Sequence, residues 1–140
     1  MPGIVATSSR PETLQMAVSA IVIWRNQLLL VRRSPPIPEQ WAPPGGKVNP
    51  GEHLLMALRR ETREEIGVAL NPVRFVAELE LHMRAKRYVL VAFLCDIMLE
   101  PERLNAATDA LETRWLSLEN ARRLPLAPGV HDVLDRLTLR

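Results

Sequence analysis

The stretch "PPGGKVNPGEHLLMALRRETREEIGV", residues 43 to 68, decides how the rest of the chain is interpreted. It opens with two prolines and two glycines and continues into a segment whose apolar residues recur at helical spacing. This spacing predicts a helix from about Glu52 or His53 to Ile66, ended by Gly67 at the position of a C-terminal cap. The stripe expected to face the core consists of Leu55, Leu58, Thr62 and Ile66.

Three carboxylates gather on the same helix. By the rule of about 100° per residue, Glu61, Glu64 and Glu65 fall within an arc of roughly 100°. Like charges at this spacing cost a few tenths of a kcal/mol per pair, so a cationic partner is expected. One interpretation is a hard divalent ion, which prefers oxygen ligands, beside a glycine pair that lets the backbone approach closely. The other is a solvated charged face, neutralised by Arg59, Arg60 and Arg63.

The spacing of these residues resembles a known family motif. Gly46, Glu52 and the run "RETREEIGV" from Arg60 to Val68 match the Nudix box, Gly-x5-Glu-x7-Arg-Glu-U-x-Glu-Glu-x-Gly-U, with U a bulky apolar residue. The box spans 23 residues and specifies nine positions, and only Thr62 departs from it, with a methyl group that can still pack on the core stripe. The segments "LLLVRR", "WAPPGGKV" and "RWLSLEN" extend the resemblance in softer form.

The resemblance to Nudix hydrolases implies an α+β fold, a Nudix-type α/β/α sandwich with a mixed central β-sheet. We expect a flexible tail over residues 1–14 and a single domain over residues 15–140. Strand candidates pair as two hairpins, one turning at Arg25-Asn26 and one at the basic connection 82–87. The proline-rich segment 34–46 is expected to be a stiff, irregular loop. A short strand, a brief helix capped by Ser117 and a final amphipathic helix complete the predicted order, after a polar link over residues 100–110.

Nudix proteins typically hydrolyse a nucleoside diphosphate linked to another group, with a divalent metal. The resemblance therefore makes Glu61, Glu64 and Glu65 metal ligands for Mg²⁺ or Mn²⁺, and gives Gly46 a backbone carbonyl ligand. Glu64 and Glu65 are the expected catalytic carboxylates. The resemblance also implies that Glu52 and Arg60 support these ligands from behind.

The candidate functional residues outside the box are supported by fewer sequence features. Glu112, three residues before Trp115, is a candidate general base, and the alternative is an ordinary exposed strand residue. Trp41 is either a surface on which a base stacks or a packing anchor beside the prolines. The candidate substrate contacts are Arg32, Arg33, Trp41 and Arg87.

The resemblance favours a pyrophosphohydrolase that acts on ADP-ribose or a nucleotide sugar. A nucleoside triphosphate pyrophosphatase, including one for oxidised nucleotides, is the alternative, because Met83 stands where the ADP-ribose branch often carries a proline. A non-catalytic nucleotide sensor is the alternative of another class, and the complete acidic set speaks against it.

Composition limits the partners. The chain has 140 residues, a net charge of +2 and only 4% aromatic residues, which argues against nucleic acid and for a small nucleotide as the partner. Its one cysteine, Cys95, lies in an apolar run and cannot form an internal disulfide. No segment reaches the roughly 18 apolar residues of a membrane span, so we expect a cytoplasmic protein without membrane contact. The family often forms homodimers, and the sequence leaves the oligomeric state open.

Overall fold

The computed structural model describes residues 13–97 and 112–138. Eight strands and three helices follow one another in these segments. The strands are β1 (Thr13–Ile21), β2 (Ile23–Trp24), β3 (Gln27–Arg33), β4 (Gln40–Ala42), β5 (Gly45–Lys47), β6 (Asn71–Met83), β7 (Lys86–Asp96) and β8 (Glu112–Leu116). The helices are α1 (Leu54–Ile66), α2 (Leu118–Ala121) and α3 (Val130–Thr138).

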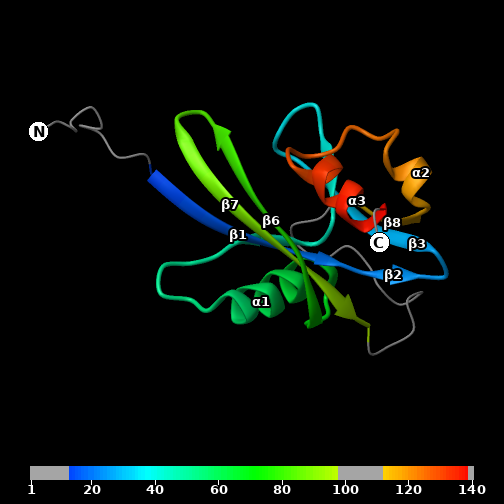
Figure 1. Ribbon diagram of the computed structural model, residues 1–140, viewed down its shortest axis with the longest axis horizontal. Coiled ribbons are helices and arrows are strands. Elements are labelled where there is room, and N and C mark those ends of the chain that lie inside the picture. The colour runs from blue at the N-terminus through cyan, green and yellow to red at the C-terminus, as the bar shows by residue number, and fades with distance from the viewer. Residues whose placement is uncertain (1–12, 98–111, 139–140) are drawn as a thin grey trace, which may run out of the picture.

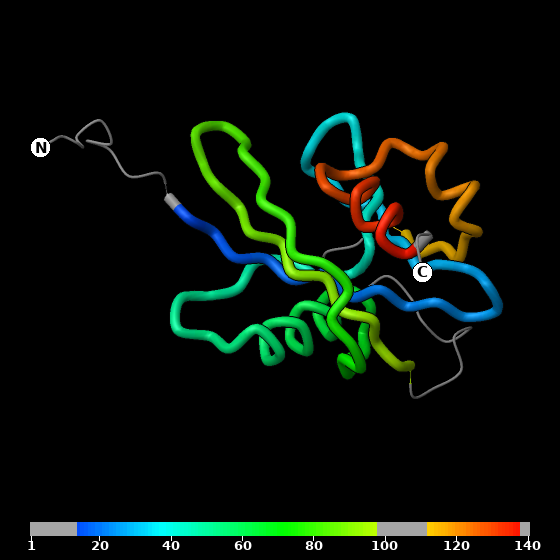
Figure 2. Tube along the Cα trace, in the orientation of Figure 1, coloured from blue at the N-terminus to red at the C-terminus, as the bar shows by residue number. Residues whose placement is uncertain are grey.

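Two four-stranded sheets form the middle layer. One has the order β5-β1-β7-β6, and in the other β3 pairs with β2, β4 and β8. The pairing of β1 with β7 is parallel and the remaining pairings are antiparallel, so the layer is mixed. The chain passes from β1 into β2 in one nearly straight line and so connects the two sheets (Figure 2).

Helices cover both faces of this layer (Figure 1). Alternate residues of β3 face opposite sides, because side chains of a strand alternate. Leu28 and Leu30 join the core on the side of α2 and α3, whereas Leu29 and Val31 join the core on the side of α1. The expected α/β/α sandwich with a mixed central layer is therefore confirmed.

Both predicted hairpins are present. Arg25 and Asn26, with φ of 52° and 62°, form the turn between β2 and β3. Arg84 and Ala85, with φ of 51° and 62°, form the turn between β6 and β7. The second turn is therefore much tighter than the predicted connection 82–87.

The proline-rich segment is more regular than the sequence predicts. It contains the short strands β4 and β5, which pair with β3 and β1 respectively. Its backbone gains these partners from distant strands, a tertiary effect that proline content alone does not reveal. The segment thereby brings Gly45 and Gly46 against both β1 and α1.

The termini of α1 agree with the prediction. The side chain of His53 accepts a hydrogen bond from the Leu55 N–H as N-cap, and Gly67 ends the helix with φ of 80°. The buried face differs in part, because Leu55 is exposed whereas Ala57 and Glu65 are buried beside Leu58, Thr62 and Ile66.

The predicted tail extends less far than expected within the described residues. β1 begins at Thr13, so residues 13 and 14 are paired in the sheet, opposite Lys86 and Arg87. Residues 1–12 and the predicted link 100–110 lie outside the described segments. Among the helices that are described, none combines the length and the apolarity needed to cross a membrane.

Candidate functional site

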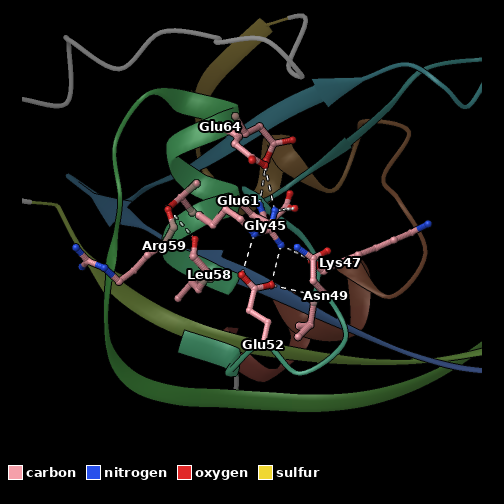
Figure 3. A network of polar contacts seen from close by, with 12 residues as sticks. Gly45, Lys47, Asn49, Glu52, Leu58, Arg59, Glu61 and Glu64 are labelled. Atoms are coloured by element: carbon pink, nitrogen blue, oxygen red, sulfur yellow. Dashed lines mark hydrogen bonds and ion pairs between the residues drawn. The ribbon is translucent and has the colours of Figure 1, made fainter. Parts of the chain in front are cut away.

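The acidic face of α1 lies against the loop that follows β5. At its centre, Arg60 donates two hydrogen bonds of 2.9 Å to Glu52, from Nε to Oε2 and from Nη2 to Oε1. The same guanidinium donates from Nη1 to Glu61 at 2.6 Å and to Glu64 at 3.1 Å, and from Nη2 to the Lys47 carbonyl at 2.9 Å. Figure 3 shows this network, with Glu52 and Glu64 on opposite sides of the point where the dashed lines meet.

Glu52 anchors the loop to the helix. Its Oε1 also accepts a hydrogen bond from the Asn49 N–H at 3.0 Å. The Arg60 guanidinium, helped by the Asn49 N–H, lowers the pKa of Glu52 from 4.5 to about 2. Glu52 in turn raises the pKa of Arg60 above its usual value. Both groups therefore stay ionised, and Glu52 holds the Arg60 guanidinium within hydrogen-bond distance of Glu61 and Glu64.

Glu61 fills the space that Gly46 leaves. A Cβ atom at position 46 would overlap the Glu61 carboxylate, so the missing side chain makes room for this acid. Burial raises the pKa of Glu61, against the opposing effect of Arg60, and the charges of Glu64 and Glu65 raise it further. The contact with Gly46 thus holds a partly desolvated carboxylate whose charged form needs a cation nearby.

Glu65 is the most buried of the three, with 3% of its surface exposed. Arg33, at the end of β3, donates from Nε to Oε2 at 2.5 Å and from Nη2 to Oε1 at 2.8 Å. The Gly45 N–H donates to Oε1 at 3.0 Å. Arg33 Nη2 also lies 3.1 Å from the carbonyl oxygens of Pro43 and Gly45. Arg33 therefore positions Glu65 and the glycine loop together.

The chemistry of this donor set fits a hard divalent cation. All side-chain donors are carboxylate oxygens, the ligands that Mg²⁺ and Mn²⁺ prefer. Within residues 13–97 and 112–138, however, no three acidic, His or Cys side chains converge on one point as metal ligands would. Arg60 and Arg33 hold the carboxylates instead. Binding of an ion by all three glutamates therefore requires these arginines to give up part of their contacts.

A cleft of about 180 Å³ opens beside the glycine loop. Arg33, Gly45 and Gly46 form its end near α1. Its other walls are largely apolar and come from β1, β6, β7 and the segment before α3, including Leu81, Met83, Tyr88, Leu90 and Pro128. An apolar cleft that ends at an arginine and two glycines suits a molecule with a flat apolar part and a phosphate part.

Arg32 and Glu112 lie on the other face of β3. They are cross-strand partners, with Arg32 Nε 3.2 Å from Glu112 Oε1, and Arg32 also contacts Glu39 at 2.6 Å. Arg114 is the main group that lowers the pKa of Glu112. Because neighbouring residues of a strand face opposite sides, the structure does not bring Arg32 or Glu112 to the acidic cluster. Glu112 is therefore not retained as the general base.

The other two candidate substrate contacts are also placed elsewhere. Trp41 is buried in the core, its backbone pairs with Pro125 and Ala127, and Arg114 stacks over its ring at 5.0 Å. It is a packing anchor. Arg87 lies on the face of β7 opposite to Tyr88, with its Nε 3.3 Å from Glu80 Oε2.

Thr62 has a role that the sequence did not indicate. Its hydroxyl donates to the Leu58 carbonyl at 2.8 Å and accepts from the Leu70 N–H at 3.0 Å, fully buried. The residue that departs from the motif thus satisfies a backbone group just beyond the helix. The period-2 pattern of β3 could have separated Arg33 from Arg32, since Arg33 continues the series of Leu29 and Val31.

Comparisons with known proteins agree with the fold. A family model described as the NUDIX domain matches residues 13–137. The chain is 31% identical over 102 residues to the asymmetrical bis(5′-nucleosyl)-tetraphosphatase of Mus musculus, covering 70% of this chain and 69% of that protein. It is 29% identical over 99 residues to the 8-oxo-dGDP phosphatase NUDT18 of Mus musculus, covering 71% of this chain and 29% of that protein. The solution structure of the E. coli ORF135 protein superposes with a TM-score of 0.80 at 28% identity, covering 91% of each chain.

Proposed function

The chain belongs to the Nudix family of hydrolases that act on phosphoanhydride bonds, and from this premise we propose that it cleaves the pyrophosphate of a small nucleoside diphosphate derivative with the help of Mg²⁺ or Mn²⁺. The observation that carries the proposal is the contact between Glu61 and Gly46. A glycine whose absent Cβ makes room for a partly desolvated carboxylate, beside two more carboxylates and an apolar cleft, is suited to phosphate chemistry.

The residues of the site fall into ligands of the cation and residues that position these ligands. Glu61, Glu64 and Glu65 are the proposed ligands of the cation, with a backbone carbonyl of Gly46 as a further ligand. When bound, a divalent ion neutralises phosphoryl oxygens and lowers the pKa of a water molecule. Arg60 and Glu52 hold the helix and the loop in register, and Arg33 sets the orientation of Glu65.

Hydrolysis joins a water oxygen to one phosphorus and breaks the bond from that phosphorus to the bridging oxygen. The bridging oxygen leaves with the other phosphate, and the water proton passes to a base. Glu64 is the box carboxylate that water reaches without rearrangement, since 46% of its side-chain surface is exposed, and we assign proton acceptance to it. The Arg33 contacts keep Glu65 from this role.

ADP-ribose or a nucleotide sugar is the substrate class that we propose first, on the sequence resemblance. A nucleoside triphosphate is the second candidate, because Met83 lines the cleft where the ADP-ribose branch often carries a proline. The two curated relatives named above add a dinucleoside tetraphosphate and an oxidised nucleoside diphosphate to the substrates worth testing. A sensor without turnover would not need the full set of carboxylates.

The test is an incubation of the protein with each of these nucleotides, in Mg²⁺ and in EDTA, with products separated by anion-exchange chromatography. We expect Mg²⁺-dependent release of two phosphate-terminated products from at least one substrate class. Glu64→Gln should lower turnover about 10²- to 10⁴-fold, as expected for loss of a general base. Arg63→Gln, a charge change at an exposed position of the same helix, is the matched control and should keep wild-type turnover. Turnover that persists in EDTA, or full activity of Glu64→Gln, would overturn the proposal.

A further inference from the structure

A second groove continues the apolar cleft outward. It has a volume of about 580 Å³ and lies between Pro35 and Pro36 of the proline-rich segment and the end of the β6–β7 hairpin. Met83, Tyr88 and Pro128 line both the cleft and this groove. The two spaces therefore share a wall, and a ligand in the cleft can extend into the groove without leaving the surface.

The groove is positively charged. Arg84 and Lys86 line it, and none of the residues that line it is acidic. Arg33, which lines the cleft, is by contrast paired with the Glu65 carboxylate. Within the described part of the chain, neither Arg84 nor Lys86 forms an ion pair. Their charge is therefore available to an anionic ligand.

The β6–β7 hairpin carries both cations to the groove. Arg84 lies in a left-handed turn position with φ of 51°, where Asn or Gly is normally preferred. Lys86 begins β7, and its Nζ lies 5.6 Å from the centre of the Tyr88 ring. One charge thus stands at the tip of a tight turn and the other stands above the ring shared with the cleft.

From this arrangement we propose that the groove binds a second phosphate, carried by the substrate on the far side of its nucleoside from the scissile anhydride. The orientation rests on the proposed function, which puts the anhydride at the glutamates, and on the apolar lining of the cleft, which suits the nucleoside. A 2′- or 3′-phosphate on the ribose then points toward Arg84 and Lys86. The substrate class is a small nucleotide with such a phosphomonoester.

The same chemistry could come from the next nucleotide of an RNA chain. A strand of RNA needs a basic track that continues beyond one phosphate and several rings on which bases stack. The groove supplies two cations and one ring, Tyr88. Two cations match the charge of one phosphate group, so we assign the groove to the small nucleotide.

The test measures binding without turnover. Isothermal titration in Mg²⁺ compares AMP with adenosine 3′,5′-bisphosphate, neither of which has an anhydride to hydrolyse, and the dinucleotide pApA serves as the RNA-like probe. We expect the bisphosphate to bind the wild type about tenfold more tightly than AMP, the range of one charge-assisted hydrogen bond. In Arg84→Gln/Lys86→Gln this preference should fall to about one, while AMP binds as before.

Arg25→Gln is the matched control, because Arg25 occupies the same kind of turn in the other hairpin. It should keep the wild-type preference. Equal binding of AMP and the bisphosphate by the wild type, or an unchanged preference in the double variant, would overturn the proposal. Tighter binding of pApA than of the bisphosphate would replace the small nucleotide with an RNA end. Because these titrations need no hydrolysis, their failure is distinguishable from a failure of the proposed function, which the turnover assay reports.

Discussion

Replacing Arg33 by alanine tests how the site holds Glu65. The substitution removes the two hydrogen bonds of 2.5 and 2.8 Å to the carboxylate, and among the described residues the Gly45 N–H remains as its donor. Removing one partner of a buried pair costs about 3 to 5 kcal/mol, because the other charge stays buried without compensation. The Glu65 side chain is 4% exposed but that of Arg33 is 29% exposed, so we expect the lower end, about 3 kcal/mol.

Urea unfolding in EDTA measures this loss. Arg32→Ala is the matched control, since Arg32 is the preceding residue of β3 and its partners Glu39 and Glu112 have side chains 43% and 34% exposed. Loss of such surface pairs costs about 0 to 1 kcal/mol. If the two variants lose similar amounts, or if Arg33→Ala loses less than about 1 kcal/mol, the Arg33–Glu65 pair does not hold the site together.

Urea unfolding of the same variants in Mg²⁺ tests whether Glu65 binds the cation. A cation bound to Glu65 replaces the missing guanidinium, and a ligand at 100 times its Kd stabilises the folded state by about 2.7 kcal/mol. In the wild type the cation must compete with Arg33, so Mg²⁺ should stabilise Arg33→Ala more than the wild type. If Arg33→Ala is less stable than the wild type by the same free energy in EDTA and in Mg²⁺, Glu65 is excluded as a ligand.

Three further substitutions test separate contacts. Gly46→Ala places a Cβ atom against the Glu61 carboxylate and should lower turnover about 10²-fold with an unchanged circular dichroism spectrum; wild-type turnover would show that Glu61 needs no such fit. Glu52→Gln should have a lower free energy of unfolding than the wild type above pH 4.5. This difference should vanish as the pH falls from 4.5 to about 2, because the pKa of Glu52 is lower in the folded state than in the unfolded state. Urea unfolding at a series of pH values would contradict this if the difference grew with acid. Thr62→Val leaves the Leu70 N–H without its acceptor and should cost about 1 to 3 kcal/mol in urea unfolding, whereas Thr62→Ser should cost less, and equal loss in both would rule the hydroxyl out.

The sequence predicted those parts of the fold that depend on local pattern. The left-handed Gly67 at the end of α1 and the turn at Arg25-Asn26 follow from neighbouring residues alone. The prediction of the buried face of α1 was partly wrong, because periodicity assigns a carboxylate such as Glu65 to the exposed side. Its partner Arg33 is 32 residues away in the sequence, and only the tertiary fold brings the two charges together.

The candidate site shows the same division. The motif placed Glu61, Glu64 and Glu65 on one helix, whereas contacts outside it depended on strand register. The place of Glu112 in the sequence suggests a general base, but its pairing with Arg32 on the other face of the sheet is a long-range property. Strand alternation was a local signal that was available and could have separated the two arginines.

Titration of Mn²⁺ into the protein, followed by the electron paramagnetic resonance signal of the free ion, tests most directly whether the α1 carboxylates bind a divalent cation. Wild-type protein should deplete the free signal at a defined stoichiometry, and Glu64→Gln should weaken binding about tenfold or more, with Arg63→Gln unchanged. Equal Mn²⁺ binding by all three proteins, or none by the wild type, would contradict the assignment of this helix face as the metal site.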